Sequence, residues 1–179
     1  KNIKKFLGKE IITYPIDTAL ESNIFKDVVV STDDIQIAEI AKKRGASVPF
    51  KRSKKNSDDW ASTFDVIEEV LNKIEESYRF ICCLYPTSVF VKSDHLLTAL
   101  NMLKRDENIS SVSSVVKYSH PLGRRLEIEN EILSIVNKAE FDNRSQDLEN
   151  YYHDAGQFYF SRTSHLKEER RMILEKTKP

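Results

Sequence analysis

Residues 27–45 read DVVVSTDDIQIAEIAKKRG, and they contain both kinds of element from which the fold is built. The β-branched run at 27–31 is typical of a buried parallel strand. Thr32, Asp33 and Asp34 supply helix-capping side chains, and isoleucine and alanine then recur at helical spacing until Gly45. A strand that leads directly into a capped helix predicts an α/β protein.

The same alternation continues on both sides of this unit. Amphipathic spacing predicts helices over residues 15–23, 62–77 and 94–104. Apolar runs predict strands over residues 48–50, 80–84, 111–117 and 157–160, and a hairpin over residues 126–135. Strands separated by helices of this length predict a single domain over residues 1–179, a three-layer α/β/α sandwich with a mostly parallel sheet.

Composition and absent motifs exclude several classes of function. Lys+Arg and Asp+Glu balance at 28 each, so no overall charge attracts nucleic acid or an acidic membrane, and no apolar run approaches a membrane span. Walker A, GxGxxG, GxSxG and zinc-spacing motifs are all missing. Cys82 and Cys83 are neighbours on a predicted strand and so face opposite ways, which predicts reduced packing residues in a cytoplasmic protein.

Polar side chains follow three of the predicted strands, at residues 31–34, 85–88 and 119–121. Ligands of α/β sheets bind beyond the carboxyl ends of the strands, so we expect these clusters to meet at one rim. Each cluster also has a simpler explanation, as helix caps, a turn or an ordinary loop. Arg52 lies among lysines that suit either a solvated charge run or a nucleotide phosphate, and Trp60 fits either a lid or a core anchor.

The densest polar segment is residues 144–160, which read RSQDLENYYHDAGQFYF. Its final Gln-Phe-Tyr-Phe predicts a strand, so the polar part before it is expected at a strand mouth. Arginine, glutamine, aspartate, histidine and several tyrosines together suit a polyhydroxylated, acidic small molecule. The segment therefore predicts a binding site for a ligand of this kind.

A series of motifs extends this interpretation. In order they are Lys1-Asn2 with Gly8-Lys9, VVVSTDD with IAEIAKKRGA, PFKR, SDDWAST, LYPTS, SHPL and the segment at 144–160. Their order and spacing over residues 1–163 resemble the CMP-sialic acid synthetase family, the cytidylyltransferases that activate nonulosonic acids. YHDAGQFY looks most like the pseudaminic acid branch, because the sialic acid branch carries an Asn-Gly pair where this chain has Ala155-Gly156.

The resemblance implies a nucleotide-diphospho-sugar transferase-like (GT-A or Rossmann-like) fold, and transfer of CMP from CTP to the anomeric hydroxyl of pseudaminic acid with release of pyrophosphate. Mg²⁺ is the implied cofactor. Lys1 is the implied catalytic residue, and the implied nucleotide-binding residues are Lys1, Asn2, Arg52, Ala61, Thr63 and Tyr85, the last in place of a family glutamine. The implied sugar-binding residues are Arg144, Gln146, His153, Asp154, Gln157 and Tyr159.

Three further expectations complete the interpretation. The family's phosphate loop would precede Lys1 and its metal-binding aspartates would follow Pro179, so we expect no metal ligands in this chain and little or no turnover by the chain as it stands. Residues 120–145 match a β-rich arm through which the family forms homodimers, although a hairpin packed on its own domain is the alternative. A CMP-N-acetylneuraminic acid or KDO-type cytidylyltransferase, or a non-catalytic nucleotide- or sugar-binding domain, remains open.

Overall fold

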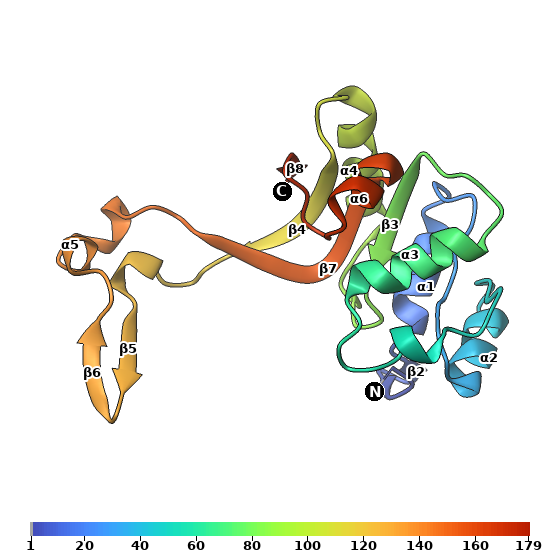
Figure 1. The fold of residues 1–179 in the computed structure, drawn as a ribbon, viewed down its shortest axis with the longest axis horizontal. Coiled ribbons are helices and arrows are strands. Elements are labelled where there is room, and N and C mark those ends of the chain that lie inside the picture. Colours follow the sequence, from blue (N-terminus) through green and yellow to red (C-terminus); the bar gives the residue numbers. More distant parts are fainter. Residues whose placement is uncertain (1) are drawn as a thin grey trace. The chain divides into compact units, whose positions relative to one another are not determined.

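The computed structural model describes residues 2–179, which form two compact units (Figure 1). We call residues 2–114 with 156–179 the core, and Val115–Ala155 the insert. The core contains the helices α1 (Thr13–Glu21), α2 (Ile35–Lys43), α3 (Thr63–Lys73), α4 (Ser93–Arg105) and α6 (Thr163–Glu169), the short turn η1 (Lys54–Asn56), and the small strand pair β1 (Lys5–Phe6) and β2 (Lys9–Glu10). The predicted helices are thus all present, with ends shifted by a few residues.

The main sheet has four strands, in the order β3 (Phe80–Leu84), β7 (Tyr152–Arg162), β4 (Ser111–Lys117) and β8 (Thr177–Lys178). β3 pairs antiparallel with β7, and β4 pairs parallel with β8. The Arg162 amide donates to Ser110 O at 2.9 Å and the Phe158 amide donates to Ser114 Oγ at 3.4 Å, so β7 also runs antiparallel to β4. Three strands therefore share one direction, and β7 alone opposes them.

Side chains of β3 alternate between two hydrophobic clusters. The even-numbered residues, including Cys82, pack on a cluster that contains the buried face of α4. The odd-numbered residues, including Cys83, pack on a second cluster built from α3 and α6. Because helices cover both faces of the sheet, the predicted three-layer α/β/α architecture is confirmed.

The two cysteines behave as packing residues, as predicted. Both thiols are unpaired, and they lie on opposite faces of the sheet. Burial raises the pKa of Cys82 well above its usual value and raises the pKa of Cys83 to about 12. Both side chains therefore stay protonated at neutral pH and have little nucleophilic character.

The segments predicted as strands at 27–31 and 48–50 pair only through isolated parallel bridges, Val29 with Ser47 and Thr32 with Lys51. The Val30 amide donates to Ser47 O at 2.9 Å, but the ladder stops there because Pro49 has no N–H to offer. These segments still support a third hydrophobic cluster with α1 and α2, in which Ala41 is fully buried.

Helix α2 begins at an N-cap made by Asp34, whose Oδ1 accepts from the Gln36 and Ile37 amides at 2.7 Å and 3.0 Å. Gly45 follows the helix with a φ of +94°, in the left-handed region that favours glycine. Both predicted helix signals at 32–34 and 45 are therefore confirmed, with Asp34 as the side chain that caps.

The insert contains the predicted hairpin, formed by β5 (Leu126–Glu129) and β6 (Ile132–Ile135), together with η2 (Leu122–Arg124), α5 (Lys138–Phe141) and η3 (Ser145–Asp147). Asn130 and Glu131 make the turn with φ values of +49° and +66°, as a two-residue hairpin loop requires. The residues expected as an arm, 120–145, lie within this unit. Across residues 2–179, no helix is long and apolar enough to span a bilayer.

Candidate functional site

Arg52 is held at the end of the segment that contains Thr32 and Asp33. Its amide donates to Thr32 O at 2.9 Å, and its Nη2 forms an ion pair with Asp33 Oδ1 at 3.3 Å. Its Nε donates to Ser57 Oγ at 3.2 Å, and the side chain is 25% exposed. The structure thus brings Arg52 together with the 31–34 cluster, and the partly covered guanidinium suits a phosphate oxygen.

The loop before α3 is shaped by Asp58. Its Oδ1 accepts from the amides of Trp60 and Ala61, at 2.9 Å and 2.8 Å. Ser62 then caps α3 in a capping box with Asp65, which fixes Thr63 as the first helical residue. Trp60 is 92% exposed, so the core-anchor interpretation is wrong for this side chain. A rigid loop that ends on a helix can present Ala61 and Thr63 to a planar ligand.

Tyr85, at the end of β3, connects the predicted nucleotide and sugar residues. Its hydroxyl lies 3.0 Å from Thr63 Oγ1, and its ring centroid lies 5.5 Å from that of Tyr159. The Gln157 carbonyl accepts from Ser88 Oγ at 2.5 Å and from the Tyr85 amide at 3.4 Å. Four of the predicted site residues therefore form one contiguous group in the core.

The side chain of Gln157 adds a hydrogen-bond acceptor to the set of residues around Tyr85. Its Oε1 is buried, and among residues 2–179 it has no hydrogen-bond partner. A buried carbonyl oxygen without a donor destabilises a folded chain by about 1–3 kcal/mol. A ligand hydroxyl or amide that reached this oxygen would therefore be bound favourably.

The remaining predicted sugar residues lie in the insert. Gln146 and His120 line a polar cavity of about 470 Å³ there. His153 Nδ1 lies 2.8 Å from the Asp154 carbonyl, and the ring meets the ring of Tyr118 edge-on at 5.0 Å between centroids. Arg144 is exposed at the start of η3. The predicted sugar residues are thus divided between the two units, with the cluster at 119–121 also in the insert.

One expectation about this segment is wrong in detail. The polar residues before Gln157 were expected at a strand mouth, yet Tyr152–Gly156 already belongs to β7. The reason is that backbone pairing, and not side-chain polarity, decides where a strand begins. Gly156 has a φ of +59°, in the region that favours glycine, and a Cβ added there would lie 3.9 Å from the Tyr85 ring.

The other predicted residues are at the beginning of the chain. Lys1, the implied catalytic residue, lies outside the described residues. Asn2 is half-buried, and its carbonyl accepts from the Ile12 amide at 3.2 Å. Within residues 2–179, no group of three or more His, Cys, Asp or Glu side chains could hold a metal ion. The described residues therefore offer no site that fits the expected Mg²⁺.

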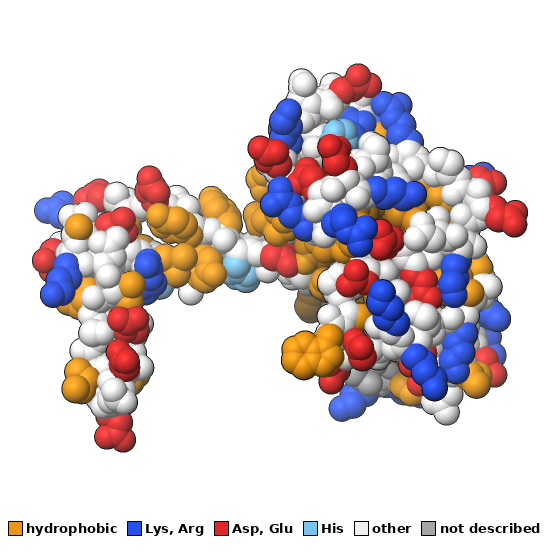
Figure 2. All heavy atoms as spheres, viewed as in Figure 1, with side chains coloured by type: hydrophobic (Ala, Val, Ile, Leu, Met, Phe, Trp, Pro, Cys, Tyr) orange, Lys and Arg blue, Asp and Glu red, His pale blue; other side chains and the backbone are white. Residues whose placement is uncertain are grey.

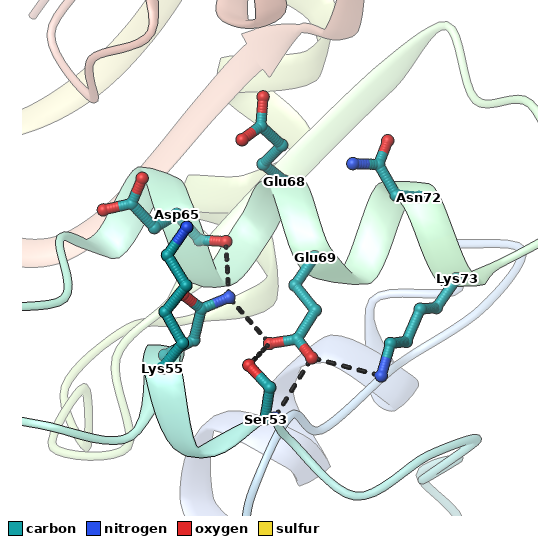
Figure 3. Close-up of a pocket in the computed structure, with 8 residues that line it drawn as sticks. Ser53, Lys55, Asp65, Glu68, Glu69, Asn72 and Lys73 are labelled. Carbon is teal, nitrogen blue, oxygen red and sulfur yellow. Dashed lines mark hydrogen bonds and ion pairs between the residues drawn. The ribbon is translucent and has the colours of Figure 1, made fainter.

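Glu69 of α3 is a residue that the sequence patterns missed. It lines a surface depression of about 320 Å³ beside η1, with Asn56 and Lys73 among its neighbours (Figure 3). It stands next to Glu68 on the polar side of an amphipathic helix, so periodicity gives no signal that separates the two glutamates. Only the folded position of the loop at 53–57 distinguishes Glu69.

These features belong to an α/β protein, and the comparison with known families gives its class, the nucleotidyltransferases. The family model for cytidylyltransferases matches residues 1–176, so the chain belongs to that family. It is 38% identical over 173 residues to the pseudaminic acid cytidylyltransferase of Campylobacter jejuni subsp. jejuni, a match that covers 94% of this chain and 74% of the relative.

A second relative supports this assignment, and a solved structure shares the fold. The N-acylneuraminate cytidylyltransferase of Streptococcus agalactiae is 31% identical over 182 residues, covering 99% of this chain and 43% of the relative. The solved structure of CMP:2-keto-3-deoxy-manno-octonic acid synthetase complexed with CTP has a TM-score of 0.70 at 17% identity, covering 95% of this chain and 70% of that one. At that identity the similarity is one of fold.

Proposed function

We propose that this chain transfers CMP from CTP to the anomeric hydroxyl of pseudaminic acid and releases pyrophosphate. The observation that carries the proposal is the group around Tyr85, in which Thr63 and Tyr159 contact one side chain from two directions. This contact supports a single site for nucleotide and sugar. The relatives named as pseudaminic acid enzymes are 38% and 36% identical to this chain, which favours that sugar.

In this reaction the anomeric hydroxyl releases its proton to solvent and its oxygen forms a bond to the α-phosphorus of CTP, while the bond from that phosphorus to the bridging oxygen breaks and pyrophosphate leaves. No covalent intermediate with the protein is required, because such transfer depends mainly on positioning and on stabilising charge. Arg52 would stabilise phosphate charge, and Ala61 and Thr63 would meet the cytosine. Lys1 and Asn2 remain the proposed residues for the triphosphate, and Mg²⁺ remains a proposed cofactor.

The residues proposed for the sugar are found in each of the two units. Gln157 and Tyr159 belong to the core, and Gln157 supplies the unpaired acceptor described above. Arg144 suits the carboxylate of a nonulosonic acid, because its planar fork matches that group. Gln146, His153 and Asp154 offer further hydrogen-bonding groups in the insert. N-acetylneuraminic acid and the octulosonic acid remain the alternative sugars.

A homodimer and a cytoplasmic location belong to the same proposal. The hairpin pairs Leu126 with Ile135 and Ile128 with Leu133, so these four apolar side chains share one face. Their exposures of 45%, 36%, 75% and 60% support contact with a second copy of the chain. The use of CTP and the two unpaired thiols support the cytoplasm.

The test is an assay of the full-length protein with CTP and each of the three sugars. We expect pseudaminic acid to be preferred by at least tenfold, and Arg52→Gln to lower kcat/KM by about 100-fold because a charge contact to phosphate is lost. Lys54→Gln, in the same loop, is the matched control. Turnover of sialic acid with pseudaminic acid inert would contradict the branch, and CTP binding without turnover of any sugar would favour the binding-domain alternative.

A further inference from the structure

We propose that Glu69 is a positioning residue that sets the place of Arg52 for nucleotide binding. The inference rests on the nucleotide role proposed for Arg52 above. Glu69 lies on α3, whereas Arg52 lies just before η1. The two side chains are connected only through the loop at 53–57. Glu69 is therefore argued to act through that loop and not by touching the nucleotide.

The carboxylate of Glu69 is almost fully used by protein donors. Its side chain is 8% exposed. Oε1 accepts from the Ser53 amide at 3.1 Å and forms an ion pair with Lys73 Nζ at 3.2 Å. Oε2 accepts from Ser53 Oγ at 3.0 Å and from Asn56 Nδ2 at 2.7 Å (Figure 3). Three of these four contacts come from the loop that follows Arg52.

A continuous set of hydrogen bonds leads from Glu69 to the guanidinium. Ser53, held by Glu69 at its amide and hydroxyl, offers its carbonyl to Ser57 Oγ at 2.8 Å. Ser57 Oγ in turn accepts from Arg52 Nε at 3.2 Å. Asp33 contacts a second nitrogen of the guanidinium, Nη2. Arg52 is thus held at Nη2 by Asp33 and at Nε by the loop that Glu69 anchors.

The negative charge of Glu69 keeps its contacts with the loop at 53–57 in place. Burial by itself would raise the pKa of Glu69, but hydrogen bonds from Asn56, Lys73 and Ser53 outweigh burial and lower the pKa to about 2. The carboxylate is therefore ionised throughout the physiological range, and the loop is held at any pH at which the enzyme would work. Lys73 is fixed as well, because its Nζ lies 4.6 Å from the centroid of the Phe50 ring.

Replacing Glu69 by glutamine keeps the shape but removes the charge, and it turns one acceptor into an NH₂ group that faces donors. We expect the loop at 53–57 to shift and Arg52 to lose its bracing from Ser57. A displacement of about 1 Å in a binding group costs up to about 100-fold in rate. The effect should appear in the interaction with CTP, while binding of the sugar should be unaffected.

The experiment measures KM for CTP and for the sugar, with kcat, in Glu69→Gln, Arg52→Gln and the double variant. We expect Glu69→Gln to raise KM for CTP by about tenfold with KM for the sugar within twofold, and to add little when Arg52 is already replaced. Glu68→Gln is the matched control, since the neighbouring Glu68 pairs with Arg170 and has no part in the loop.

Each outcome decides the inference. An unchanged KM for CTP in Glu69→Gln, or fully additive effects in the double variant, would overturn it while leaving the proposed function intact. A lower melting temperature with unchanged kinetics would show that Glu69 is only structural, and would also overturn it. A wild type that neither binds nor turns over CTP would instead refute the proposed function, and the inference with it.

Discussion

The core and the insert use their apolar residues in opposite ways. All of the buried hydrophobic side chains found among residues 2–179 belong to the core, where most of them form three clusters around the sheet and its helices. In the insert, residues such as Ile128 and Leu133 are 75% and 60% exposed, and hydrophobic side chains lie on the surface (Figure 2). The apolar side chains of the core bury one another, whereas residues of the insert leave one apolar face of the hairpin uncovered.

This contrast explains why the two units should respond differently to the same kind of mutation. In the core, each buried side chain is surrounded by others of the same chain, so its removal leaves a cavity. A two-stranded hairpin such as β5–β6 is at best marginally stable alone, and its apolar face gains little until another surface covers it. Core residues should therefore control folding, and hairpin residues should control association.

The largest expected effect is on folding of the core. Phe160 is 2% exposed and stacks on Phe25 with 5.7 Å between ring centroids. Phe160→Ala should lower the free energy of unfolding by about 3–5 kcal/mol, because it removes a buried ring and leaves a cavity. Urea denaturation of dilute protein measures the change. Ile128→Ala in the hairpin is the control, expected within about 0.5 kcal/mol of wild type, and a loss equal to that of Phe160→Ala would refute the contrast.

Much of this fold follows from local sequence patterns. Alternation along residues 80–84 predicted that Cys82 and Cys83 face opposite layers, and the clusters on the two faces of the sheet confirm it. The hairpin was equally readable, since Leu126, Ile128, Leu133 and Ile135 alternate with polar residues and the observed register pairs them on one face. These features depend on neighbours in sequence, which a pattern can show.

Non-local features could not be read in this way. The antiparallel direction of β7, and its start at Tyr152, depend on which strands it pairs with. The division of the sugar residues between two units is likewise a property of the whole chain. Glu69 shows the same limit at a single residue, because its partners Ser53 and Asn56 are 16 and 13 positions away.

The second prediction tests the hairpin directly. Ile128 and Leu133 pair across the two strands of the hairpin. The double variant Ile128→Glu, Leu133→Glu therefore places two charges on the apolar face of the hairpin. If a second copy covers this face, the dissociation constant of the dimer should rise by at least about 100-fold, because each buried aliphatic side chain contributes about 1.5–3 kcal/mol. Sedimentation velocity over a range of concentrations gives the constant.

The control for this pair lies on the opposite face of the same hairpin. Ile132 pairs with Glu129, so Ile132→Glu adds one charge without touching the apolar face. We expect it to leave association nearly unchanged. A monomeric wild type, or equal effects from both sets of substitutions, would refute the homodimer and favour a hairpin that packs within its own chain.

The smallest expected effect compares one tyrosine from each unit. Tyr85→Phe removes a hydroxyl that lies 3.0 Å from Thr63 Oγ1, whereas Tyr118→Phe keeps the ring contact with His153 in the insert. The half-buried Thr63 hydroxyl would lose its partner, so Tyr85→Phe should lower the free energy of unfolding by about 0.5–1.5 kcal/mol. Tyr118→Phe should change it by less than about 0.5 kcal/mol.

The variants Tyr85→Phe and Tyr118→Phe should also differ in their effect on catalytic activity. Because the Tyr85 hydroxyl orients Thr63 beside the proposed cytosine position, Tyr85→Phe should lower kcat/KM for CTP by about 5–10-fold, equivalent to about 1 kcal/mol of lost transition-state binding. Steady-state kinetics with CTP varied at saturating sugar measures this change. An equal loss in both variants would mean that the insert contributes to nucleotide binding as much as the core does. A loss in Tyr118→Phe seen only when the sugar is varied would instead agree with nucleotide contacts in the core and some of the sugar contacts in the insert.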